Sequence, residues 1–152
     1  MSNSTKFVNL NEYMEVVKEL IDGVKEVPLI ASGNSMTPFI VHQRDTIFIS
    51  KPNDKLHKGD MVFFQRDTGK YVMHRIYHIN KNDQYFMVGD NQTYIEGPIE
   101  KSQIFAIVKK VSRNGKLITQ HDIIWKFFQY VWIRIVPFRP VIGKLHKLII
   151  RK

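Results

Sequence analysis

The segment Ala31-Ser-Gly-Asn-Ser-Met-Thr-Pro-Phe39 is the part of this chain around which the rest is organised. It is short and polar, it contains a glycine, and apolar residues flank it on both sides. Helix and strand cores do not have this composition, so we expect a loop. A connecting loop seldom places Met directly after Ser and Pro two residues later, and we therefore interpret Ser35 as a nucleophile. A Gly-x-Ser triplet alone is common, and the alternative is a surface turn with an incidental serine.

The composition is that of one globular domain. The chain has 152 residues, 43% hydrophobic and 24% charged, which is enough for a single core. It contains no cysteine, which excludes disulfides, thiolate metal sites and a cysteine nucleophile. No apolar run follows a basic flank near the first residue, and eighteen uncharged apolar residues nowhere run together. We therefore expect neither a cleavable signal peptide nor an ordinary membrane-spanning helix.

The alternation of apolar runs and turns predicts a mainly β, antiparallel domain. Apolar residues repeat at helical spacing from Leu10 to Ile21, ahead of Gly23, and predict an N-terminal helix. A short apolar segment, 27–31, leads into the Ser35 loop. Further apolar runs separated by short polar turns are typical of an antiparallel sheet or barrel. Strands are expected at 46–50, 61–65, 70–79, 85–88, 104–111 and 116–119.

The last thirty residues differ in charge and in pattern. Residues 121–152 contain seven Lys or Arg and one acidic residue, so they carry most of the net charge of +9. A first amphipathic helix is predicted over 122–136, and Pro137 and Pro140 separate it from a second amphipathic piece. Aromatic and basic residues together suit a helix in a membrane interface, and a helix that covers the β domain is the alternative. We therefore divide the chain into residues 1–120 and 121–152. The apolar arc of the first helix comprises Ile124, Phe127, Phe128, Val131, Trp132 and Ile135.

Two residues downstream could act together with Ser35. A serine hydroxyl needs an adjacent base, and histidine suits that task because its ordinary pKa of about 6.5 lies near working pH. His74, in Tyr71-Val-Met-His-Arg-Ile76, is the candidate base. Asp90, in Gly89-Asp-Asn91, is a candidate carboxylate to orient the imidazole and stabilise its charged form.

Four motifs occur in the order and approximate spacing of the type I signal peptidase family. They are Ser35-Met36 with Pro38, Gly59-Asp60-Met-Val-Phe63, and the two segments around His74 and Asp90, and they span about residues 28–110. The chain resembles that family, whose catalytic domain is β-rich and related to that of the self-cleaving SOS repressors. The resemblance implies a serine endopeptidase that needs no cofactor. Its substrate would be a precursor protein or peptide, from which it removes a leader or signal peptide after small residues.

The resemblance also implies roles for single residues. Ser35 is the expected nucleophile and His74 the expected base. The common bacterial enzymes have lysine at the position of His74, whereas the endoplasmic-reticulum and archaeal subgroup has histidine. In that subgroup an acidic residue in or shortly after the Gly-Asp-Asn box orients the histidine. Both Asp90 and Glu96 are candidates here, because Glu96 stands where the subgroup usually has Asp. The loop residues Gly33, Ser35 and Met36 would form the oxyanion site, with the Ser35 N–H as donor.

One departure from the family concerns the membrane. The family carries a spanning helix ahead of the nucleophile, whereas this chain has a polar amphipathic helix there. We expect residues 121–152 to replace that anchor by contacting a membrane surface, with the active site on the cytoplasmic face. No metal site is expected, because the histidines lack ligand spacing: on a strand, His74 and His78 would lie about 13 Å apart.

Two alternatives to a leader-cleaving enzyme stay open. The first is self-cleavage, as in the SOS repressors, but the chain has neither the Ala-Gly nor the Cys-Gly dipeptide that those relatives cut. The second is a non-catalytic module that binds membrane or nucleic acid through its basic C-terminal segment. Bulky aliphatic and aromatic residues among the cations favour lipid, so we do not expect nucleic acid as a partner. The sequence makes no prediction of the oligomeric state.

Overall fold

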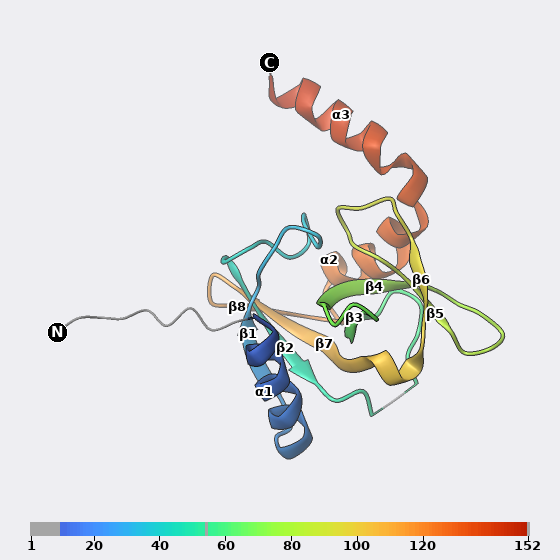
Figure 1. Cartoon of the computed structure of the whole chain (residues 1–152). Coiled ribbons are helices and arrows are strands. Elements are labelled where there is room, and N and C mark those ends of the chain that lie inside the picture. The colour runs from blue at the N-terminus through green and yellow to red at the C-terminus, as the bar shows by residue number, and fades with distance from the viewer. Residues whose placement is uncertain (1–9, 54, 152) are drawn as a thin grey trace.

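In the described part of the chain eight strands form one antiparallel sheet, with helices before and after it (Figure 1). The computed structural model describes residues 10–53 and 55–151. The strand order is β1-β2-β7-β3-β4-β5-β6, and β8 pairs with the end of β7. The predicted mainly β fold with an N-terminal helix and C-terminal helices is therefore confirmed. The strands are β1 (Val27–Ile30), β2 (Asp45–Ser50), β3 (Met61–Gln65), β4 (Tyr71–Ile79), β5 (Tyr85–Val88), β6 (Glu96–Ile99), β7 (Ile104–Arg113) and β8 (Lys116–Thr119).

The sequence pattern located most strands and missed one. The predicted strands at 61–65, 85–88 and 116–119 have the observed bounds, and the others differ at their ends. Strand β6 was not predicted, because Gly97 and Pro98 interrupt it. Proline cannot donate to a β ladder and is tolerated at a sheet edge, and β6 is the last strand in the order.

The N-terminal helix α1 (Leu10–Gly23) packs one face on the sheet. Met14, Val17 and Ile21 are buried at spacings of three and four residues, as the sequence predicted for a helix covering the core. They belong to one apolar cluster with residues of β1, β2 and β7. Residues 1–9 lie outside the described part of the chain.

Strand β4 is covered on both of its faces. Three consecutive residues, His74, Arg75 and Ile76, are buried. Successive side chains of a strand point to opposite faces, so His74 and Arg75 face different surroundings. A second apolar cluster, which includes Val62, Phe64 and Ile76, fills one of these sides.

The continuous helix predicted over 122–136 is wrong. The chain forms α2 (Ile123–Lys126), a π-helical turn η2 (Phe127–Val131) and two 3₁₀ turns, η3 (Trp132–Arg134) and η4 (Val136–Phe138). The π turn shifts the periodicity, and of the predicted arc Phe128 alone is buried. The buried residues of this covering segment, 123–138, are Trp125, Phe128, Ile133 and Val136.

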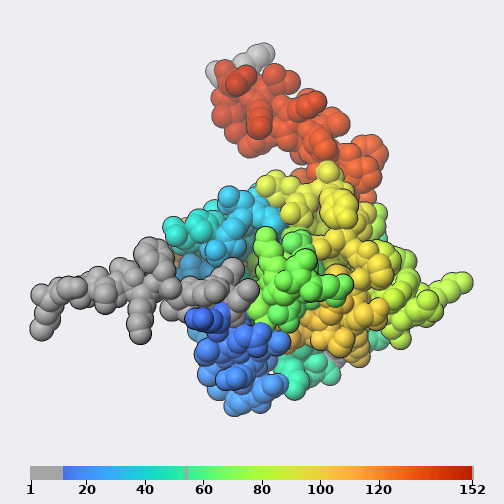
Figure 2. Space-filling view, in the orientation of Figure 1, coloured from blue at the N-terminus to red at the C-terminus, as the bar shows by residue number. Residues whose placement is uncertain are grey.

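The covering segment and the last helix differ in how they meet the domain. The ring of Phe39 lies 5.5 Å from that of Trp125 and 4.9 Å from that of Phe128, so the covering segment is packed directly beneath the Ser35 loop. Helix α3 (Arg139–Ile150) instead projects away from the rest of the domain (Figure 2). None of the described helices is long and apolar enough to cross a bilayer.

Candidate active site

The loop over 31–40 is a series of tight turns fastened by two buried side chains. Met36 and Phe39 point into the core, while Ser35 is half-buried. Thr37 donates from its hydroxyl and from its N–H to the Asn34 carbonyl, at 2.7 and 3.2 Å. Gly33 adopts a φ of +84°, which favours glycine. The local sequence therefore holds Ser35 at the surface on a rigid, well-packed turn.

Ser35 and His74 line the same pocket. It has a volume of about 390 Å³ and lies between the Ser35 loop, α1, and strands β1 to β4. Apolar side chains form much of its wall, and a small number of polar groups reach it, which is typical of a ligand site. The structure thus brings together the predicted nucleophile and the predicted base. The loop residues Gly33 and Met36 line the pocket as well, as does Lys70 just before β4.

His74 is almost fully buried in β4 and faces Glu96. Its Nδ1 atom lies 3.1 Å from Oε1 of Glu96. The two atoms are close enough for an ion pair with a protonated imidazole, and Nδ1 makes no hydrogen bond to any described residue. Burial lowers the pKa of His74 below its ordinary value, the Glu96 carboxylate opposes that shift, and the charge of Arg66 adds to it. The imidazole is therefore neutral at neutral pH, which is the form a general base requires.

Glu96 is held in place by Arg66, a residue that sequence reasoning did not identify. The guanidinium donates from Nε to Oε2 and from Nη2 to Oε1 of Glu96, both at 2.8 Å. Burial alone would raise the pKa of Glu96, but these hydrogen bonds, the Arg66 charge and His74 outweigh it and lower the pKa. A charged carboxylate therefore lies beside the imidazole. No signal in the sequence links Arg66 at the end of β3 to a residue thirty positions later.

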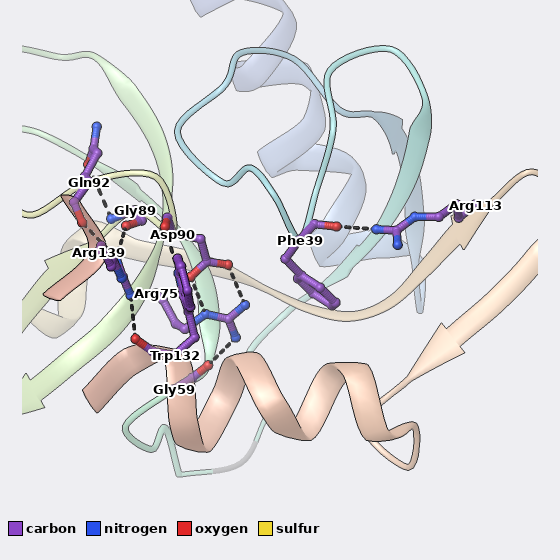
Figure 3. Close-up of polar contacts among 9 residues, drawn as sticks. All are labelled: Phe39, Gly59, Arg75, Gly89, Asp90, Gln92, Arg113, Trp132 and Arg139. Carbon is purple, nitrogen blue, oxygen red and sulfur yellow. Dashed lines mark hydrogen bonds and ion pairs between the residues drawn. The ribbon is translucent and has the colours of Figure 1, made fainter. Parts of the chain in front are cut away.

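Asp90, the other candidate carboxylate, is paired with Arg75 and not with His74 (Figure 3). Arg75 donates from Nε and Nη2 to the two carboxylate oxygens at 2.9 and 2.8 Å, and from Nη1 to the Gly59 carbonyl at 2.8 Å. Both side chains are completely buried. Two opposite charges with these hydrogen bonds satisfy each other inside the protein. The geometry gives Asp90 and Arg75 a structural part.

The Gly89-Asp-Asn91 turn contacts the nucleophile through the backbone. The Asn91 N–H donates to the Ser35 carbonyl at 2.9 Å. A Cβ atom on Gly89 would lie 2.6 Å from that same carbonyl oxygen, so only glycine fits there. The motif therefore supports Ser35 from behind, and this explains its glycine without a catalytic role for the aspartate side chain.

Arg139, the first residue of α3, closes the other side of this turn (Figure 3). Its Nη1 donates to the carbonyls of Gly89 and Gln92, both at 2.8 Å, and its Nη2 donates to the Trp132 carbonyl at 3.0 Å. The Trp132 indole in turn donates to the Asp90 carbonyl at 2.8 Å. The turn behind Ser35 is thus tied to the start of α3. Sequence reasoning placed Arg139 only among the cations of the basic segment.

The other acidic and histidine residues form no comparable site. Asp60 accepts from the His57 N–H at 2.8 Å, as expected of a turn carboxylate. Among the described residues, no three His, Asp or Glu side chains lie close enough together to hold a metal ion.

A comparison with protein-family models identifies the family of the domain. The model described as Peptidase S24-like matches residues 2–112, well over half of the chain. The match includes Ser35, His74, Asp90 and Glu96 and ends before the covering segment. The chain therefore belongs to the Peptidase S24-like family and contains a domain of the serine-peptidase type. No curated protein matches the chain.

Proposed function

We propose that this member of the Peptidase S24-like family is a serine endopeptidase of the signal-peptidase type. The observation that carries the proposal is one pocket lined by Ser35 and by a buried His74 whose Nδ1 lies 3.1 Å from Glu96. A nucleophile, a base and a carboxylate that orients the base are the parts of a serine-protease triad.

In the first step His74 accepts the Ser35 proton. With Nδ1 directed at the Glu96 carboxylate, the proton of the neutral ring is on Nδ1, which leaves Nε2 free as the acceptor. The Ser35 oxygen attacks the carbonyl carbon of the peptide bond, and the imidazolium formed is stabilised by Glu96. His74 then donates its proton to the departing amine. In the second half of the reaction His74 accepts a proton from the water that attacks the Ser35 acyl ester, and returns it to the Ser35 oxygen as the acid product leaves.

The oxyanion of the tetrahedral intermediate needs hydrogen-bond donors that are already in position. The Ser35 N–H is the proposed donor. The Gly33 N–H already donates to Nδ1 of His42 at 3.0 Å, so it does not serve this role in the observed conformation. Because the Asn91 N–H holds the Ser35 carbonyl, the peptide unit between Ser35 and Met36 is fixed before substrate arrives.

The proposed substrate is a leader or signal peptide of a precursor, bound in extended form. The resemblance to signal peptidases supports cleavage after small residues. The pocket supports an apolar side chain near the scissile bond, because Leu29, Met36, Ile40, Ile47 and Phe63 contribute to its wall.

The proposal is tested by incubating the full chain with a library of precursor-derived peptides in the presence of lipid vesicles. New peptide termini are identified by mass spectrometry. Cleavage by the wild type should be lost in Ser35→Ala and in His74→Ala, by about 10³-fold or more.

Two control variants match these changes in chemistry. Ser102→Ala alters an exposed serine in the 3₁₀ turn η1 (Lys101–Gln103), and His78→Ala alters an exposed histidine on the same strand as His74. Both should keep wild-type activity. Cleavage that persists in Ser35→Ala, or a wild type that cleaves no peptide, would contradict the proposal and favour a non-catalytic module.

A further inference from the structure

Helix α3 leaves its apolar side chains uncovered. From Pro140 to Arg151 every residue is exposed, and the one buried residue of the helix is its first, Arg139. The exposed fractions of Leu148 and Ile149 are 64% and 73%. Figures 1 and 2 show the helix projecting from the domain, and the outer turns of the helix are not covered by the domain. A contiguous apolar face of this kind marks a binding surface.

The helix segregates its apolar and basic residues. At about 100° per residue, five aliphatic side chains fall within an arc of about 120°. Lys144, Lys147 and Arg151 fall on the neighbouring arc. The five residues of this aliphatic arc are Val141, Ile142, Leu145, Leu148 and Ile149, and Ile150 lies outside it.

The charge of this region identifies the partner. Between Ile123 and Lys152 the sequence contains no Asp or Glu and seven Lys or Arg. Cations beside an aliphatic face complement a surface that is anionic outside and apolar beneath, which is an anionic lipid bilayer. Nucleic acid would match the cations but would leave the aliphatic face in water.

We propose that α3 binds anionic membranes by lying in the interface, with its aliphatic arc in the lipid and its cations at the headgroups. Its twelve residues span about 18 Å, too short for a hydrocarbon core of about 30 Å. The exposed Phe138, directly before the helix, adds an aromatic side chain at the same level.

This docking also sets where the pocket lies. Arg139 joins the start of α3 to the carbonyls of Gly89 and Gln92, and Gln92 lines the pocket of Ser35 and His74. A membrane-bound α3 therefore holds the domain with that turn near the lipid surface. Lipid binding itself does not depend on catalysis, so it can be tested separately from the proposed peptidase activity.

The test is co-sedimentation of the full chain with phosphatidylcholine vesicles, with and without phosphatidylglycerol at about a third of the lipid. Binding should require the anionic lipid and weaken at about 1 M salt. Lys144→Gln with Lys147→Gln should lower the partition coefficient about 25-fold, at about fivefold per cation. Leu145→Asn with Leu148→Asn should lower it at least about tenfold.

Lys81→Gln with Lys101→Gln removes the same charge from exposed sites outside α3 and should leave binding nearly unchanged. All the altered side chains are exposed, so the unfolding temperature serves as a check that each variant folds. The proposal is overturned if the wild type does not bind anionic vesicles, or if the control pair weakens binding as much as the α3 pair. It is also overturned if duplex DNA or self-association occupies α3 in place of lipid.

Discussion

Asp90 and Glu96 lie six residues apart, and each accepts two hydrogen bonds from an arginine. Asp90 and Arg75 are completely buried, and their hydrogen bonds are made with each other and with the Gly59 carbonyl. Glu96 is half-buried behind His74, and its Oε1 atom faces both Arg66 and Nδ1 of His74. The difference between the pairs is therefore that the Glu96 carboxylate also contacts His74, whereas, among the described residues, the Asp90 carboxylate contacts only its arginine through side-chain hydrogen bonds. The position of each carboxylate within a motif did not identify which of them faces His74, whereas its contacts in the structure did.

Among changes to these two carboxylates and their arginines, Glu96→Gln should produce the largest loss of activity. An amide in place of the carboxylate no longer stabilises the imidazolium and can favour the wrong tautomer of His74. We expect kcat to fall about 10²- to 10⁴-fold on a peptide that the wild type cleaves. The Arg66 pair is partly exposed, so the free energy of unfolding should fall by about 1 kcal/mol at most. An unchanged kcat would remove Glu96 from the site.

Asp90→Asn should show the opposite profile. It leaves the Arg75 guanidinium buried without a counter-charge, which costs about 3–5 kcal/mol of unfolding free energy. The kcat of the folded fraction should change less than about tenfold, because Asp90 does not contact the imidazole.

The paired variant Asp90→Leu with Arg75→Met serves as its control. It should lose less stability than the sum of the two single changes, since no charge is then left unpaired. Denaturant unfolding and kcat, measured on the same samples, separate the two effects. A kcat loss for Asp90→Asn as large as that of Glu96→Gln would exchange the roles of the carboxylates.

Arg66→Gln should have the smallest effect. Arg66 lowers the pKa of both Glu96 and His74, so its removal should raise both. The base must be neutral, and activity is lost as pH falls through the His74 pKa. The acid limb of the pH profile should therefore move to higher pH, while the plateau of kcat changes about threefold or less. A shift of the acid limb to lower pH would contradict the contacts proposed among Arg66, Glu96 and His74.

The sequence predicted the parts of the molecule that follow local rules. Alternating strands and short turns gave the β fold, and the polar turn before Phe39 gave the Ser35 loop. The sequence did not predict the Arg66–Glu96 pair, because it depends on the end of β3 and the start of β6 coming together across thirty residues. Nor did it predict β6, since Gly97 and Pro98 carry no strand signal.

The basic C-terminal segment was predicted as two amphipathic pieces, and the sequence did not predict that their surroundings would differ. Its first half covers Phe39 with the buried Trp125 and Phe128, whereas α3 buries none of its aliphatic side chains. Amphipathic periodicity is the same for a helix that packs on its own domain and for one that binds another surface. The apolar arc predicted over 122–136 also assumed regular α-helical geometry, which the π-helical turn η2 interrupts.

The pH dependence of kcat/KM for the wild type tests the central claim most directly, namely that His74 is the base for Ser35. Burial lowers the His74 pKa, so activity should rise with pH through a midpoint below 6.5 and stay level above it. Lys70 lines the same pocket and is the competing base. An activity that appears only above about pH 8 and disappears in Lys70→Ala, but not in His74→Ala, would contradict the account.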